Sequence, residues 1–195
     1  TGYIGNEERP NIEDYLSSVQ MGLWMPLSRA HGKTPREPWQ YGDMALKEVK
    51  KWINFRHRLV PYLYHTACQT HQSGIPMIRP LVMEYPKDPI AKIQNLSYML
   101  GDALLISPGF DRDEYELYLP EGRWQDIESK EVYEGMTFVH IENKAFADGG
   151  TSLRVFQKEG TSIPLFAQKE VLHVPAQLWK QEDLEFMTFQ KKDVD

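Results

Sequence analysis

The sequence predicts an α+β protein in two parts, a helical part over residues 1–74 and an antiparallel β-sandwich over residues 75–195. Two observations support this. The first part has the order helix, strand, loop, helix, which is the order in which an α/β barrel ends. The second part has short runs of β-branched and aromatic residues separated by clusters of Gly, Pro, Asp and Asn, as is typical of a sandwich. The change in composition near Gly74 marks the predicted boundary.

The helical part should open with a helix that ends near Leu23. Asn11 is a suitable N-cap, because its side chain can accept a hydrogen bond from a free backbone N–H of the first turn. The apolar face of this helix comprises Ile12, Tyr15, Leu16, Val19 and Leu23. Residues 24–30 are short and apolar and predict a buried strand, while the Gly- and Pro-rich residues 31–42 predict a loop.

A long helical region should follow, with Asp43 as its N-cap. Pro61 lies inside this region. Proline lacks a backbone N–H and clashes with the preceding turn, so the helix should kink or divide there. Ser73 and Gly74 should end the helical region, since glycine readily takes the left-handed conformation found after a helix.

Six runs in the second part predict strands because they are short and rich in β-branched and aromatic residues. They are residues 77–85, 103–107, 115–119, 137–141, 153–156 and 162–166. Residues 86–100 are compatible with a short helix. Residues 178–189 fit a strand and a helix equally well.

Charge and composition exclude several function classes. The net charge is −6 and the 22 basic residues are scattered, so the positive footprint that nucleic acid requires is missing. No apolar run approaches the length of a membrane span, so no membrane partner is expected. Cys68 is the only cysteine, which excludes an internal disulfide and a cysteine-based zinc site and fits a cytoplasmic location. Because the sequence does not begin with Met, a native targeting signal is expected to lie outside it.

A series of short motifs runs through the chain in one order. Together the motifs resemble glycoside hydrolase family 31, and the resemblance covers roughly residues 1–165. The motifs, in chain order, are Gln20, Gly22 and Pro26; Arg29-x-His31-Gly32; Arg36-Glu37-Pro38-Trp39; Arg56-x-Arg58-Leu59; Pro61-Tyr62-Leu63-Tyr64; Gly74-Ile75-Pro76; Arg79-Pro80-Leu81; Glu84-Tyr85-Pro86; residues 101–105; and residues 118–122 with Trp124.

The resemblance implies that the chain holds the last strand and helix of a (β/α)8 TIM barrel and the β-sandwich packed behind it. It implies a retaining α-glycosidase, in which an aspartate nucleophile and an aspartate acid lie only about 5 Å apart. Both aspartates are expected upstream of Thr1, so the chain alone is expected to be inactive and to need the rest of the parent barrel as a partner. The expected substrate is an oligosaccharide with terminal α-linked glucose or xylose, and no metal or organic cofactor is implied.

Several points stay open at this stage. The α-glucosidases and α-xylosidases of the family are not separated by these motifs, and neither are hydrolysis, transglycosylation and lyase chemistry. The resemblance also leaves the oligomeric state open. Two other classes of protein remain as alternatives. One is a non-catalytic carbohydrate-binding β-sandwich, which would need exposed aromatic side chains in a row on one sheet face. The other is a structural module that only completes the fold of another chain.

Three residues are candidates for substrate binding. The resemblance assigns His31 to hydrogen bonds with the sugar whose bond is cut, and an imidazole offers the donor and acceptor that a pair of hydroxyls needs. Arg29 would face the same side as His31 on a strand, where it could orient a carboxylate or make a structural ion pair. Tyr3 stands near the position of a pocket-lining aromatic residue in the family, although this sequence departs from that motif. Arg36 and Trp39 look like a packed scaffold for the loop.

Overall fold

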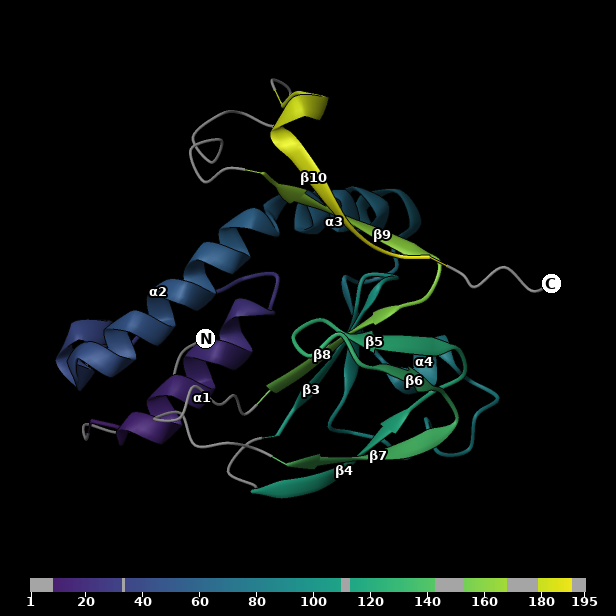
Figure 1. Cartoon of the computed structure of the whole chain (residues 1–195), viewed down its shortest axis with the longest axis horizontal. Helices are drawn as coiled ribbons and strands as arrows, with labels where there is room; N and C mark the ends of the chain where they lie inside the picture. The colour runs from purple at the N-terminus through teal and green to yellow at the C-terminus, as the bar shows by residue number, and fades with distance from the viewer. Residues whose placement is uncertain (1–8, 33, 110–112, 143–152, 168–178, 191–195) are drawn as a thin grey trace.

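A computed structural model of the chain describes residues 9–32, 34–109, 113–142, 153–167 and 179–190. Helices come first and antiparallel sheets follow, as the sequence predicts (Figure 1). The three long helices are α1 (Ile12–Leu23), α2 (Gly42–Arg58) and α3 (Val60–Ser73). None of the helices in the described ranges has the length and apolar character needed to span a lipid bilayer.

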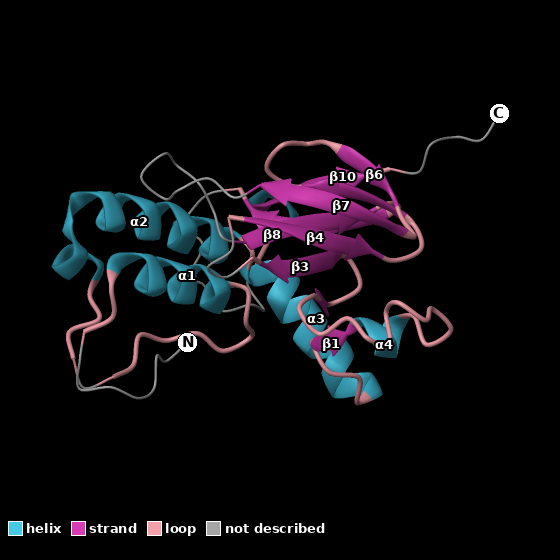
Figure 2. Cartoon of the chain, turned by 90° about the horizontal axis from the view of Figure 1, so that it is seen from below, coloured by secondary structure: helices cyan, strands magenta, loops and turns pink. Residues whose placement is uncertain are grey.

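The local signals for α1 act as predicted. The Asn11 side chain accepts a hydrogen bond of 2.8 Å from the backbone N–H of Asp14, which confirms it as the N-cap. Tyr15 and Leu16 are buried, and they belong to a small apolar cluster with Ala45 and Val49 of α2. This cluster holds α1 and α2 side by side (Figure 2).

The division of the second helical region is also confirmed, but its cap is not. The α2 helix begins at Gly42 after Tyr41, with no side-chain cap, so the prediction of Asp43 as N-cap is wrong. The Asp43 carboxylate lies in the first turn, where it still interacts favourably with the helix dipole. Leu59 separates α2 from α3, and Pro61 lies at the start of α3, where a missing N–H costs nothing. Gly74 ends α3 with φ 75°.

The buried strand expected over residues 24–30 is absent. The backbone there forms turns and bends, Leu27 is 81% exposed, and only Trp24 of these residues is buried. A strand needs a neighbour for its N–H and C=O groups. In the part of the chain that the structure describes, no strand forms a ladder with this segment.

In the ranges that the structure describes, the strands form three antiparallel sheets. The largest has six strands in the order β1-β2-β3-β8-β5-β6, and the two smaller sheets pair β4 with β7 and β9 with β10. In chain order the strands are β1 (Ile78–Pro80), β2 (Tyr98–Leu100), β3 (Leu104–Pro108), β4 (Glu114–Leu119), β5 (Arg123–Asp126), β6 (Val132–Glu134), β7 (Thr137–Glu142), β8 (Leu153–Lys158), β9 (Thr161–Phe166) and β10 (Leu184–Phe189). The described residues also form the short helices η1 (Pro38–Tyr41), α4 (Leu81–Glu84) and η5 (Gln181–Asp183).

Five of the six runs predicted as strands are strands. The exception is residues 77–85, where a three-residue strand is followed directly by the short helix α4. Residues 86–97 form turns and bends rather than a short helix, and β2 follows them. Residues 184–189 are a strand, which resolves the ambiguity there. Strands β2, β5 and β6 were not predicted from the sequence.

Side chains of the large sheet alternate between two cores. Leu104 and Ile106 of β3 belong to the first core with Trp24, Leu59, Tyr62 and Leu63 of the helical part and with Ile163 and Leu165 of β9. Leu105 of the same strand belongs to the second core, together with side chains of β4 and β7. This is the period of two that a sheet covered on both faces must show. The helices and β9 therefore cover one face of the sheet, and the β4–β7 pair covers the other.

The division of the chain at residue 74 remains a prediction. The first core includes side chains from both sides of this position, such as Leu63 and Leu104. Tyr62 adds a polar tie across it: its hydroxyl donates to the Leu100 carbonyl at 2.6 Å and accepts from the Ala103 N–H at 3.2 Å. The two parts are thus packed against each other.

Candidate functional site

The segment between α1 and α2, residues 24–41, carries two of the candidate residues and is called the site loop here. Arg29 and His31 both lie in it with exposed side chains. Tyr3 lies outside the described residues. Contacts of these residues with a sugar remain a prediction, since they belong to the expected substrate complex.

Arg56 of α2 holds the start of the site loop. Its Nη1 donates to the Leu23 carbonyl, and its Nη2 donates to the Pro26 carbonyl at 3.1 Å. Leu23 is the last residue of α1, where helix carbonyls lack partners within the helix. Burial lowers the pKa of the Arg56 guanidinium, because a partly dry surrounding disfavours the charged form. The hydrogen bonds to the two carbonyls offset the free-energy cost of partly burying this charge.

Tyr15 of α1 holds the second half of the loop. Its hydroxyl donates to the Arg36 carbonyl at 2.9 Å, and its ring stacks on Tyr41 with centroids 3.8 Å apart. Burial raises the pKa of Tyr15 to about 12, so this hydroxyl stays a donor at neutral pH. A Cβ atom at residue 32 would lie 2.5 Å from Nε of Arg36, so the glycine after His31 lets the loop pass close to that buried side chain.

The scaffold prediction for this loop is right for Arg36 and wrong for Trp39. Arg36 is buried, whereas Trp39 is 62% exposed. Trp39 lies in η1, a short helix that contributes no residue to the apolar clusters beyond Tyr41. The indole therefore does not help to pack the loop within the described residues.

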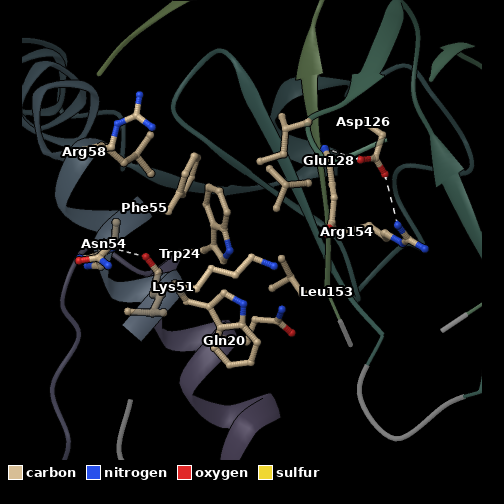
Figure 3. Close-up of a pocket in the computed structure, with 16 residues that line it drawn as sticks. Gln20, Trp24, Lys51, Asn54, Phe55, Arg58, Asp126, Glu128, Leu153 and Arg154 are labelled. Carbon is tan, nitrogen blue, oxygen red and sulfur yellow. Dashed lines mark hydrogen bonds and ion pairs between the residues drawn. The ribbon is translucent and has the colours of Figure 1, made fainter. Parts of the chain in front are cut away.

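A pocket of about 420 Å³ lies behind the start of the site loop, between α1, α2 and the ends of β5 and β8 (Figure 3). Trp24 and Phe55 form an aromatic wall, with ring centroids 5.6 Å apart. Neither Arg29 nor His31 lines this pocket. The lining comprises Gln20, Leu23, Trp24, Lys51, Trp52, Asn54, Phe55, Arg56, Arg58, Leu59, Asp126, Ile127, Glu128, Leu153, Arg154 and Val155.

The opposite wall of this pocket carries a fixed carboxylate. Asp126 is buried, and its Oδ1 accepts from the backbone N–H groups of Glu128 and Ser129 at 2.8 and 3.1 Å. Its Oδ2 lies 3.7 Å from Nη1 of Arg154. A carboxylate with this many partners stabilises the turn after β5. The pocket thus has aromatic rings on one side and structural polar groups on the other.

A smaller polar pocket of about 330 Å³ lies near the end of α3, and Arg79 and Asp102 are among the residues that line it. Buried Arg79 pairs with Asp102 at 2.6 Å and with Glu84 at 3.0 Å. The Asp102 carboxylate pairs with Arg79 and also accepts a hydrogen bond from the Gln69 side chain at 3.5 Å. Within the described ranges, no three His, Cys, Asp or Glu side chains are grouped so that they could hold a metal ion.

The exposed residues of the site loop can be named from the sequence, but the side chains that hold the loop in place cannot. Arg56 was recognised only as part of a motif, and Tyr15 only as a residue on an apolar helix face. The partners of both are backbone carbonyls more than 20 residues away in the sequence. The Arg56-x-Arg58 motif was the available signal, because a partly buried arginine in a helix that packs on others needs hydrogen-bond acceptors.

Two family models match the chain in consecutive order. The Glycosyl hydrolases family 31 TIM-barrel domain matches residues 2–66, and the Glycosyl hydrolase family 31 C-terminal domain matches residues 74–170. Together these matches cover both parts of the predicted fold, the end of a barrel and the domain that follows it.

Curated relatives agree with these matches. The 1,6-alpha-glucosyltransferase of Sporosarcina globispora is 32% identical over 165 residues, which is 82% of this chain and 13% of that protein. The Neutral alpha-glucosidase AB of Homo sapiens is 32% identical over 164 residues, which is 80% of this chain and 17% of that protein. The chain therefore spans less than a fifth of the length of these two relatives.

Solved structures give the same picture. The Flavobacterium johnsoniae GH31 dextranase complexed with glucose matches with a TM-score of 0.71 and 32% identity, over 80% of this chain and 20% of that one. The cycloalternan-forming enzyme from Listeria monocytogenes in complex with a pentasaccharide substrate matches with a TM-score of 0.80 and 29% identity. This second match covers 95% of this chain and 19% of that one.

Proposed function

Because this chain belongs to glycoside hydrolase family 31, we propose that it is the C-terminal portion of the catalytic barrel and the adjoining domain of a retaining α-glycosidase. The observation that carries the proposal is the order of the two family matches, barrel end at 2–66 and C-terminal domain at 74–170. The proposed reaction is hydrolysis of terminal α-linked glucose or xylose from oligosaccharides. Glucose is favoured by the names of the relatives, an α-glucosidase and an α-glucosyltransferase.

In this proposal the chain binds and positions the sugar, and two carboxylates outside the chain carry out the bond cleavage. One carboxylate attacks the anomeric carbon as the glycosidic C–O bond breaks, and a carboxylic acid gives its proton to the leaving oxygen. The same acid, now a carboxylate, then takes a proton from the water that releases the sugar. His31 would hold hydroxyls of the sugar at the cleaved bond, Arg29 would orient a carboxylate, and Tyr3 would line the pocket.

A second candidate reaction is transfer of the glucosyl group to another sugar instead of water. Two comparisons favour it, the 1,6-alpha-glucosyltransferase and the cycloalternan-forming enzyme. The covalent intermediate is the same in both reactions, and only the acceptor differs. Whether water or a second sugar accepts the glucosyl group depends on the subsite that follows the cleaved bond.

The alternative of a non-catalytic carbohydrate-binding sandwich has little support. It needs a row of exposed aromatic side chains on one sheet face. On the described strands, the exposed aromatic side chains are Phe138 on β7 and Phe186 on β10, which belong to different sheets. This alternative also leaves the helical part without a role.

The test uses the intact protein that carries this chain, with aryl α-glucoside and aryl α-xyloside as substrates. The expected products keep the α configuration, which proton NMR of the released sugar shows before mutarotation. Added isomaltose would reveal transfer as a longer oligosaccharide. The 195-residue chain assayed by itself should show no turnover above buffer. Inversion of configuration, or no cleavage of either glycoside, would contradict the proposal.

A further inference from the structure

The start of the site loop has few backbone restraints of its own. Residues 24–30 form no strand, so no ladder fixes their direction. The last backbone hydrogen bonds of α1 run from Trp24 N–H to the Met21 carbonyl at 3.2 Å and from Met25 N–H to the Gly22 carbonyl at 3.1 Å. Beyond them Pro26 has no N–H to donate. The next backbone pairing that the described structure shows is an isolated bridge at His31, so the chain between Met25 and that bridge needs side chains to direct it.

Arg56 meets this need with two donors on one rigid plane. One donor binds the carbonyl of Leu23, the last residue of α1, and the other binds the carbonyl of Pro26, three residues further on. The last turn of α1 contains no basic residue, so Arg56 also supplies the positive charge that a helix C-terminus favours. Since a guanidinium keeps its donors in a fixed fork, binding both carbonyls sets the angle at which the chain leaves α1.

Arg58 on the same helix holds a different part of the molecule. Its Nε donates to the Phe166 carbonyl of β9 at 3.0 Å, and its Nη2 pairs with Glu185 of β10. Two arginines, two residues apart, thus reach to opposite neighbours of α2. One neighbour is the site loop and the other is the β9–β10 pair.

We propose that Arg56 is a positioning residue for the substrate-binding segment, which it orients by holding the carbonyls of Leu23 and Pro26. This proposal rests on the proposed function, in which Arg29 and His31 contact the sugar and a carboxylate. Arg58 has the same side chain and a comparable burial, so it is the matched control for the structural cost of losing an arginine from α2.

The first test measures amide hydrogen exchange in the 195-residue chain, with Arg56→Met and Arg58→Met compared with wild type. Arg56→Met should speed exchange at Trp24 and Met25 by about tenfold or more, because fraying of a helix end needs only local opening. Arg58→Met should leave these two amides unchanged and speed exchange near Ala167, whose N–H bonds to the Asp183 carbonyl. Equal effects of both variants on Trp24 and Met25 would overturn the proposal.

Arg56→Lys separates geometry from charge, and it serves if Arg56→Met does not fold. Lysine keeps the positive charge but donates from a single point, so it should not hold both carbonyls. We expect its exchange at Met25 to resemble that of Arg56→Met. Wild-type protection in Arg56→Lys would overturn the claim that the two-pronged contact orients the segment.

The second test measures kcat and KM in the intact glycosidase at a temperature where all variants are folded. Arg56→Met should lower kcat/KM by about tenfold or more, with much of the loss in kcat, because misplacement by about an ångström can cost a hundredfold. Arg58→Met should stay within about twofold of wild type. If His31→Ala is impaired while the two arginine variants match each other, the Arg56 proposal fails alone. If His31→Ala is fully active, the proposed function of the loop fails.

Discussion

The site loop and strand β3 differ in how their backbones are held in place. β3 pairs with β2 on one side and with β8 on the other, and all five of its residues are buried. The site loop has one isolated backbone bridge, at His31, and is otherwise held by side chains, with Arg56 at its start and Tyr15 near its end. A strand inside a sheet shares its restraints among many hydrogen bonds, whereas a loop held by two side chains can keep its functional groups exposed. Changes in the two regions should therefore have opposite consequences.

The largest expected effect lies in the sheet. Phe156 of β8 is fully buried between the large sheet and the β4–β7 pair. Phe156→Ala should lower the free energy of unfolding by about 3–5 kcal/mol, because it removes buried apolar surface and leaves a cavity. Urea denaturation of the 195-residue chain measures this. Phe138→Ala, on the half-exposed Phe138, is the control and should cost about 1 kcal/mol or less.

The next effect lies in the site loop and concerns activity. His31→Ala in the intact enzyme should cost about 2–4 kcal/mol in kcat/KM, since a hydrogen bond to a sugar hydroxyl strengthens in the transition state. The exposed His31 side chain has little packing to lose, so stability should change by about 1 kcal/mol or less. Kinetics and melting temperature on the same variant give both numbers. Activity within a few-fold of wild type would make His31 an ordinary loop residue, and unfolding would place it in a core.

A middle case joins the two parts of the chain. Tyr62→Phe leaves the Leu100 carbonyl and the Ala103 N–H without their buried partner, which should cost about 1–3 kcal/mol of stability. Tyr64→Phe, on the same helix but half-exposed, should change stability by about 0.5 kcal/mol or less. Thermal unfolding followed by circular dichroism separates the two variants. If they behave alike, the hydroxyl of Tyr62 does not tie α3 to the β2–β3 turn.

The smallest effect is a pH dependence on the outer face of the β4–β7 pair. Glu116 accepts a hydrogen bond from His140 at 2.7 Å and raises the pKa of His140, with Glu114 and Glu142 adding to the rise. A raised folded pKa means that the contribution of His140 to stability is complete below its unfolded pKa of about 6.5. That contribution is lost as the pH rises through the folded pKa.

An NMR titration of the His140 ring tests this. Glu116→Gln removes the charge of the main partner, so the pKa of His140 should fall towards its ordinary value. Glu182→Gln is a suitable control, because Glu182 pairs with Lys180 instead. An unchanged pKa of His140 in Glu116→Gln would contradict the assignment of the shift to that carboxylate.

The exposed residues of the candidate site could be nominated from the sequence, but their supports could not. Arg29 and His31 stand in a short motif whose neighbours are visible along the chain. The carbonyls held by Arg56 lie 33 and 30 residues before it, and their position depends on how α1 packs on α2. The ion pair of Asp102 could not be predicted for the same reason, because its partner Arg79 lies 23 residues away in the sequence. A pattern of residue types carries no direct information about such pairs.

The sequence by itself determined where α1 begins, where α2 gives way to α3 and where α3 ends, because the signals for these positions act within about one helical turn. Asn11 caps α1, Pro61 stands at the break between α2 and α3, and Gly74 ends α3, because each depends on atoms within a few residues. Whether a short apolar run became a strand was decided only by the tertiary structure. Residues 104–108 pair with a strand on each side, whereas residues 24–30 pair with no strand within the described chain. A strand's hydrogen bonds are made with distant segments, so the partners, and not the run itself, decide the outcome.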